Sequence, residues 1–273
     1  DNIPHVKAYW VMLGREAAFV PGRPAVQRIL AQGGWVNGDA AFEGPNPPGD
    51  AQITYYQKKR HIFGDLTIEI LDKDGKSLAT IPSSKRRGLS RASWSMRLKP
   101  PRTPPAATAA GAGIGPRLVP GTYTVKMTKD KQTYTEKLQV VADPRSQHTP
   151  EDRKAEFDLA MQLYRDLGDM TFAVDRINGV RAELEARAGK LPAGDPFAAR
   201  LRTAAAQADA LRKKIVATTE GGAITGEERL REYLADLYSN VVYYEGRPSQ
   251  TQVDRAASLE RELGDVVKDF DAW

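Results

Sequence analysis

The spacing of hydrophobic residues changes near position 143, and this change predicts a strand-rich part followed by a helical part. In Leu66–Ile70, apolar and polar residues alternate with a period of two, as in a strand with one buried face. Asp74-Gly75 predicts a tight turn between two strands. Strands are expected at 51–57, 66–70, 76–81, 91–98, 122–128 and 133–141. Short strands separated by turns predict an immunoglobulin- or fibronectin-like β-sandwich over residues 51–143.

Two stretches rich in proline interrupt this pattern. Residues 1–50 end in the run Gly44–Gly49, where prolines exclude both a helix and a central strand, so we expect an extended lead-in segment. Pro100–Pro120 is rich in Pro, Ala and Gly, and we expect a flexible loop there.

Residues 149–273 carry the spacing of amphipathic helices. The seam of the first predicted helix consists of Ala160, Leu163, Leu167, Met170, Val174 and Ile177. Thr149-Pro150 predicts its start and Asp195-Pro196 that of a second helix. Capping boxes at Thr225/Glu228 and Ser249/Gln252 predict a third and a fourth. Because the connections are short, we expect an antiparallel bundle of three to four helices with coiled-coil-like packing. The predicted fold class is therefore α+β.

The third predicted helix has more large apolar residues than one seam requires. Its seam is Leu230, Leu234, Leu237 and Val241, and a second stripe consists of Tyr233, Tyr238, Val242 and Tyr243. Either this helix is packed on two sides, between bundle and sandwich, or the second stripe is an interaction surface. Tyrosine suits an interface because it supplies contact area and a polar tip. We predict that a stable partner touches this stripe.

Composition and charge narrow the classes of partner. The 273 residues are 41% hydrophobic and 27% charged, which are globular values, and no apolar run is long enough for a transmembrane segment. The net charge is +5, and the densest cationic cluster, Lys85-Arg86-Arg87, lies in a predicted loop. Without a nucleic-acid-binding motif or a basic face, this cluster predicts an exposed basic loop and no nucleic-acid site.

No residues form a recognisable catalytic or metal-binding pattern. Cysteine is absent, and His5, His61 and His148 lie in separate segments. Gly75-Lys76-Ser77 lacks the upstream glycine of a phosphate loop, and the hairpin turn around it explains the glycine. Asp72 does not begin a calcium loop, because Ser83 stands where a bidentate Glu is required. The sequence predicts no enzyme, catalytic residue, cofactor or metal.

Several short motifs follow one another in an order that points to a family. They are Asn46-Pro47-Pro48, Ala51–Tyr56, Gly88–Arg91, Pro120–Val125, Asp143-Pro144-Arg145 and Gly246-Arg247-Pro248. Together they resemble the C-terminal region that follows the β-propeller in bacterial BNR (sialidase-repeat), sortilin-like proteins, which are often labelled glycosyl hydrolases. Ser90 departs from the family pattern, which has Asn there, and the propeller itself is absent. Any hydrolase activity implied by the resemblance belongs to the propeller.

The resemblance and the residues together give two hypotheses for function. The first is a non-catalytic interaction or assembly module of a bacterial envelope or exported protein, in the periplasm or at the cell surface. Its partner would be a protein or a second copy of the chain. The alternative is a carbohydrate-binding accessory region of an exported glycoside hydrolase, with aromatic rings stacking on sugars. The candidate rings are Trp35, Tyr55, Tyr56, Tyr243 and Tyr244.

Overall fold

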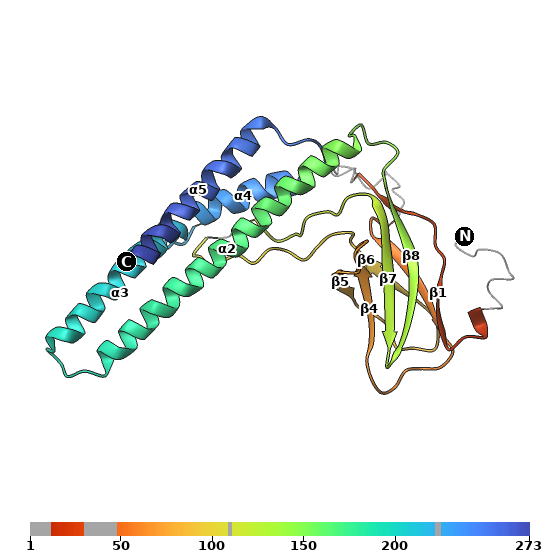
Figure 1. Ribbon diagram of the computed structural model, residues 1–273, viewed down its shortest axis with the longest axis horizontal. Coiled ribbons are helices and arrows are strands. Elements are labelled where there is room, and N and C mark those ends of the chain that lie inside the picture. The colour runs from red at the N-terminus through yellow and green to blue at the C-terminus, as the bar shows by residue number, and fades with distance from the viewer. Residues whose placement is uncertain (1–11, 30–47, 109–110, 222–224) are drawn as a thin grey trace, which may run out of the picture. The chain divides into compact units, whose positions relative to one another are not determined.

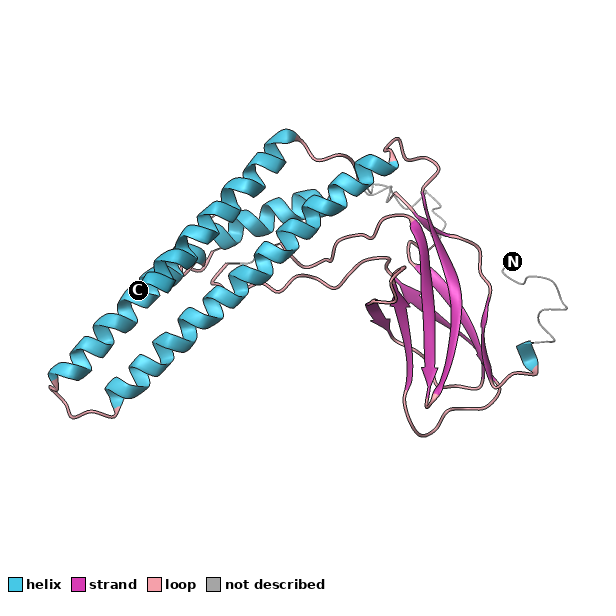
Figure 2. Ribbon diagram, in the orientation of Figure 1, coloured by secondary structure: helices cyan, strands magenta, loops and turns pink. Residues whose placement is uncertain are grey.

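The computed structural model describes residues 12–29, 48–108, 111–221 and 225–273, and it confirms a mixed α+β protein (Figure 1). In sequence, the strands β1–β8 precede the long helices α2–α5, and Figure 2 colours these strands magenta and these helices cyan. The chain forms two compact units. The sheet unit lies within residues 1–98 and 117–150, and the helical unit within 99–116 and 151–273.

The sheet unit contains two sheets. The three-stranded sheet has the order β1 (Ala17–Val20), β3 (Ala51–Gln57), β6 (Gly88–Trp94). The five-stranded sheet has the order β2 (Ala25–Gln27), β8 (Gln132–Ala142), β7 (Gly121–Lys129), β4 (Leu66–Leu71), β5 (Ser77–Ile81). Neighbouring strands are antiparallel except β2 and β8, which are parallel. The strands predicted from the alternating pattern are thus present.

Each sheet buries one face, because alternate residues of its strands point to the same side. In β4, Leu66, Ile68 and Ile70 are buried while the residues between them are half-exposed. The rings of Trp94 on β6 and Tyr123 on β7 meet edge to face with centroids 5.6 Å apart. The buried faces of the two sheets therefore contact each other.

The predicted lead-in segment is partly strand, which corrects the expectation for residues 1–50. β1 pairs with β3 and β2 pairs with β8, so the chain crosses from one sheet to the other through residues 21–24. These strands have four and three residues, too few to show a period in the sequence. The rest of the predicted lead-in, residues 1–11 and 30–47, falls largely outside the described residues.

The helices are α2 (Pro150–Gly189), α3 (Pro196–Ile215), α4 (Leu230–Tyr243) and α5 (Gln250–Ala272). The predicted starts of α2, α3 and α5 are confirmed. The Asp195 carboxylate accepts a hydrogen bond from the Phe197 amide at 2.7 Å, and Ser249 and Gln252 cap α5 reciprocally. The predicted Thr225/Glu228 box is wrong. The Glu232 carboxylate instead accepts from the Arg229 amide at 3.1 Å, and α4 starts at Leu230.

The helical unit has one hydrophobic core, to which every one of these helices contributes. Members that are fully or almost fully buried include Leu163, Leu167, Met170, Ala208, Ile215, Leu234, Tyr238 and Leu259. The predicted α2 seam supplies Leu163, Leu167 and Met170. Ala112, which lies between β6 and β7 in the sequence, also belongs to this core.

The segment 99–116 was expected to be a flexible loop, but it lies in the helical unit and is bonded to its helices. The Arg231 side chain donates to the carbonyl oxygens of Pro104 at 2.7 Å and Thr108 at 3.1 Å. The Ala107 amide donates to the Ala217 carbonyl at 3.1 Å. Proline and glycine disfavour regular structure in this segment. Its backbone carbonyls therefore accept hydrogen bonds from side chains of another element.

Candidate functional site

Burial splits the predicted interaction stripe of α4 into two parts. Tyr238 and Val242 are 0% and 1% exposed, whereas Tyr233 and Tyr243 are 41% and 69% exposed. The expectation of a surface stripe is therefore wrong for Tyr238 and Val242. The Tyr238 hydroxyl donates to the Ile114 carbonyl at 2.7 Å, so the segment 99–116 packs against this side of α4. Within the helical unit, α4 is therefore packed on two sides, by the other helices and by this segment.

The tyrosines that stay exposed lie on α4 and just after its end. Tyr233, Tyr243 and Tyr244 are 41%, 69% and 51% exposed, and we call them the α4 tyrosines. The Arg255 guanidinium of α5 lies 5.2 Å from the centre of the Tyr233 ring, a cation–π distance. Val253 of α5 is also exposed. Two of the four predicted stripe residues, Tyr233 and Tyr243, thus face solvent.

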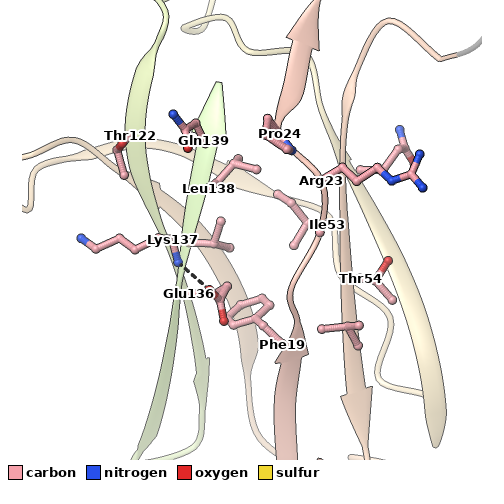
Figure 3. A pocket seen from close by; sticks show the side chains of 14 residues that line it. Phe19, Arg23, Pro24, Ile53, Thr54, Thr122, Glu136, Lys137, Leu138 and Gln139 are labelled. Carbon is pink, nitrogen blue, oxygen red and sulfur yellow. Dashed lines mark hydrogen bonds between the residues drawn. The ribbon is translucent and has the colours of Figure 1, made fainter. Parts of the chain in front are cut away.

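A cavity of about 270 Å³ opens in the sheet unit between the two sheets (Figure 3). Strands β1 and β3 form one wall, β7 and β8 the other, and residues 22–24 the rim. Phe19, Ile53 and Val125 are buried and give the cavity an apolar floor. Of the polar lining residues, Glu136 lies on the inward face of its strand, whereas Gln52, Thr54, Thr122 and Gln139 alternate with inward residues and lie on the outward faces. Such a mixture suits a small polar ligand with one apolar face.

Glu136 is the unusual residue of this cavity, because it occupies an inward position of β8. Its partner in the sheet register is Val125, which is buried. The Glu136 carboxylate accepts a hydrogen bond from the Lys137 amide at 3.1 Å, and it forms no ion pair with a described residue. The sequence analysis missed this site. The signal in the sequence was that Glu136 shares one face of the predicted strand with the apolar residues Tyr134, Leu138 and Val140, because alternate residues point to the same side.

A carboxyl with a perturbed pKa lies in the helical unit. Asp166 of α2 is buried, and its Oδ2 has no hydrogen-bond partner among the described residues. Burial, together with the nearby carboxylates of Glu260 and Asp169, raises the pKa of Asp166 to about 6. The Gln162 side-chain amide donates a hydrogen bond to Oε2 of Glu260 at 3.1 Å. Asp166 of the helical unit therefore resists ionisation.

We expect Asp166→Asn to stabilise the protein at pH 7.5 and to have little effect near pH 4. The raised folded-state pKa means that ionisation costs folding free energy as pH rises from about 4 to about 6, and this cost persists at higher pH. The shift corresponds to at most about 3 kcal/mol. Urea unfolding at the two pH values measures it, with the exposed Asp265→Asn as control. An equal effect of Asp166→Asn at both pH values would contradict this origin.

The candidate phosphate and calcium motifs form the β4–β5 turn. The Asp72 Oδ1 accepts hydrogen bonds from the amides of Asp74 and Lys76, both at 2.9 Å, and Gly75 has a φ of +80°. The Asp72 oxygen is therefore engaged by the turn itself. Within the described ranges, no three His, Cys, Asp or Glu side chains are grouped as metal ligands.

Comparisons of the chain with protein-family models, curated proteins and solved structures gave no match. The resemblance to propeller-associated regions therefore stays a prediction from the motifs. Of the rings considered for sugar stacking, Tyr55 is fully buried, Tyr56 is half-buried, and Trp35 lies outside the described residues. Among the helices that the structure describes, none has the length and hydropathy to cross a bilayer.

Proposed function

We propose that the chain is a non-catalytic interaction and assembly module of a larger bacterial envelope or exported protein. In this proposal an immunoglobulin-like sandwich and an antiparallel helical bundle carry a surface that binds a protein partner. The motif order from Asn46 to Pro248 supports a place behind a β-propeller, in the periplasm or at the cell surface.

The strand order supports an immunoglobulin- or fibronectin-like sandwich. The first strands switch between the two sheets, and β2 runs parallel to β8 at the sheet edge. At the start of β7, the Tyr123 hydroxyl donates to the Val119 carbonyl at 2.6 Å, which is the arrangement of a tyrosine corner. Burial raises the pKa of Tyr123 to about 12, so the phenol keeps the proton that it donates.

The helix connections support an antiparallel bundle. Short connections join α2 to α3 and α4 to α5, and short connections favour antiparallel neighbours. The shared core of these helices includes Leu167, Leu234 and Leu259. Segment 99–116 adds Ala112 to the same core.

The exposure of the α4 tyrosines is the observation that carries the proposed function. α4 buries Leu234 and Tyr238, yet Tyr233 and Tyr243 still extend into solvent. A helix fixed by a core presents these rings at a small further loss of entropy when a partner binds. Tyrosine contributes an apolar ring and a hydroxyl that hydrogen-bonds at an interface. A protein surface with apolar groups and exposed carbonyls fits this chemistry.

We expect the double variant Tyr233→Ala, Tyr243→Ala to lose at least about tenfold in partner binding while keeping its thermal stability, because both rings are exposed. The measurement compares proteins captured from source cells by the wild-type chain and by the variant. Phe197→Ala is the matched control, since Phe197 of α3 is 57% exposed and lies in another helix. Identical capture by all three proteins would reject the α4 tyrosines as the docking surface.

A carbohydrate-binding accessory region is the second candidate function, and the cavity of the sheet unit favours it. Glu136 supplies a carboxylate of the kind that binds sugar hydroxyls, beside the apolar side chains of Phe19 and Ile53. A glycan array with the purified chain distinguishes the two candidates. Glycan binding that Glu136→Gln abolishes and the tyrosine variant leaves intact would favour the second.

A further inference from the structure

Two loops of the sheet unit are bonded together at one end of the sheets. They are the β3–β4 loop, residues 58–65, and the β5–β6 loop, residues 82–87, and we call them the basic loop pair. The His61 amide donates to the Lys85 carbonyl at 2.9 Å, and the Lys85 ammonium donates to the Gly64 carbonyl at 2.8 Å. Each loop therefore fixes the backbone of the other.

Buried polar groups of β3 anchor the basic loop pair from below. The Gln57 amide, which is fully buried, donates to the Ser84 carbonyl at 2.9 Å and to the Arg86 carbonyl at 3.2 Å. The buried Tyr55 hydroxyl donates to the Ser84 carbonyl at 2.9 Å. The conformation of these loops thus depends on the core of the sheet unit.

The tip of this anchored structure is apolar and faces solvent. Ile62 is 66% exposed and Phe63 is 85% exposed, the highest value among the exposed large hydrophobic residues, although the adjacent His61 is only 7% exposed. Gly64 follows with a φ of +81°, a left-handed conformation that turns the chain back. The loop buries His61 and projects the two apolar side chains outward.

Cations surround this apolar tip. The basic loop pair carries Lys58, Lys59, Arg60, Lys85, Arg86 and Arg87, and its only acid is Asp65. All six cationic residues are exposed. Lys58 lies 3.8 Å from Glu16, but the other five form no ion pair with any described residue. Their charge is available to an external anionic surface.

The β7–β8 turn lies at the same end of the sheet unit (Figure 1). The Asp130 amide donates to the Asp65 carbonyl at 3.3 Å, and the Asp130 carboxylate lies 3.5 Å from the His61 imidazole. Lys129 and Lys131 flank Asp130 and add positive charge to this end. The cationic region therefore spans three connections that are far apart in sequence.

We infer that the basic loop pair binds the surface of an anionic lipid bilayer, with Ile62 and Phe63 entering the interface. Two adjacent protruding apolar side chains within a ring of cations match a bilayer, which offers hydrocarbon and anionic headgroups at the same surface. An acidic protein surface would match the positive charge of the loops, but it would leave Ile62 and Phe63 without an apolar groove to enter. This binding is independent of the α4 tyrosines, and it brings the chain to the surface of a membrane.

Vesicle co-sedimentation of the intact chain tests this inference. We expect binding to vesicles of equal parts phosphatidylglycerol and phosphatidylcholine, and none to phosphatidylcholine alone. Raising NaCl from about 50 to about 500 mM should weaken the binding, because the salt screens the cations. The double variant Ile62→Ser, Phe63→Ser should lower the partition coefficient at least about tenfold. Arg86→Gln, Arg87→Gln should lower it and reduce the salt dependence.

Matched controls separate this site from general charge and hydrophobicity. Arg200→Gln, Arg202→Gln on α3 removes the same charge, and Phe197→Ser removes an exposed ring elsewhere, so both should bind as the wild type does. Thermal melts check that each variant folds. Wild-type protein that ignores anionic vesicles, or binding unchanged in the Ile62/Phe63 variant, would overturn the inference. Binding to polyglutamate but not to vesicles would overturn it in favour of an acidic protein.

Discussion

Arg231→Met is expected to destabilise the protein by about 3–5 kcal/mol, because it removes a buried cation that binds two backbone carbonyls and a carboxylate. Arg231 is 7% exposed, and its guanidinium donates to Pro104 O, Thr108 O and, at 2.7 Å, the Glu232 carboxylate. Methionine fills much of the same volume but leaves the Pro104 and Thr108 carbonyls without this donor. The Glu232 carboxylate loses its cation and keeps its bonds to the Thr108 hydroxyl and the Arg229 amide. The variant should also loosen the backbone around Pro104 and Thr108, whose carbonyls Arg231 binds.

Urea unfolding followed by circular dichroism at 222 nm measures this loss of stability. Arg200→Met is the control, since Arg200 is exposed on α3 and forms no ion pair with the described residues. It should change the unfolding free energy by less than about 0.5 kcal/mol. If Arg231→Met costs no more than this control, the hydrogen bonds to the segment 99–116 do not stabilise the helical unit.

Leu167→Ala should cost about 2–5 kcal/mol of unfolding free energy. Leu167 is fully buried in the core that α2 shares with the other helices, so the deleted atoms leave a cavity. The cost depends on how far the neighbouring side chains collapse into that space. Chemical denaturation measures it.

Val253→Ala on α5 provides a comparison, because Val253 is 42% exposed and its truncation opens no cavity. We expect a change below about 1 kcal/mol for this variant. A similar small effect for Leu167→Ala would mean that the α2 seam faces solvent or a partner, and that the helical core is wrongly assigned.

Most of the regular structure was predictable because it depends on local patterns. The alternation in Leu66–Ile70 predicts β4, and Asp195-Pro196 and Ser249 mark the helix starts that the structure confirms. The predicted start of α4 was wrong, because this region holds two acids, Glu228 and Glu232, that each follow a possible N-cap residue by three positions. Glu232, which bonds to the Arg229 amide, competes with Glu228.

The errors concern contacts between residues far apart in sequence. Pro100–Pro120 lacks any period, and nothing in it predicts that Arg231, more than a hundred residues later, binds its carbonyls. The burial of Tyr238 depends on the same segment. A helical stripe shows which residues share a face, but it does not show what covers that face.

The candidate surfaces were predictable only in part. Tyr233 and Tyr243 are exposed as predicted, and Lys85-Arg86-Arg87 is an exposed basic loop as predicted. The protrusion of Phe63 follows from hydrogen bonds between two loops and a strand, and loop composition does not encode it. Glu136 was visible in the sequence only after its strand register was known.

Amide hydrogen exchange of Ala107 tests most directly the claim that the segment 99–116 belongs to the helical unit and thereby limits the docking surface of α4. The Ala107 amide donates to the Ala217 carbonyl, so it should be protected together with the core of α2 and should lose this protection in Arg231→Met. Exchange of Ala107 at the rate of an unfolded chain, while α2 stays protected, would contradict the account. Tyr238 and Val242 would then return to the surface available to a partner.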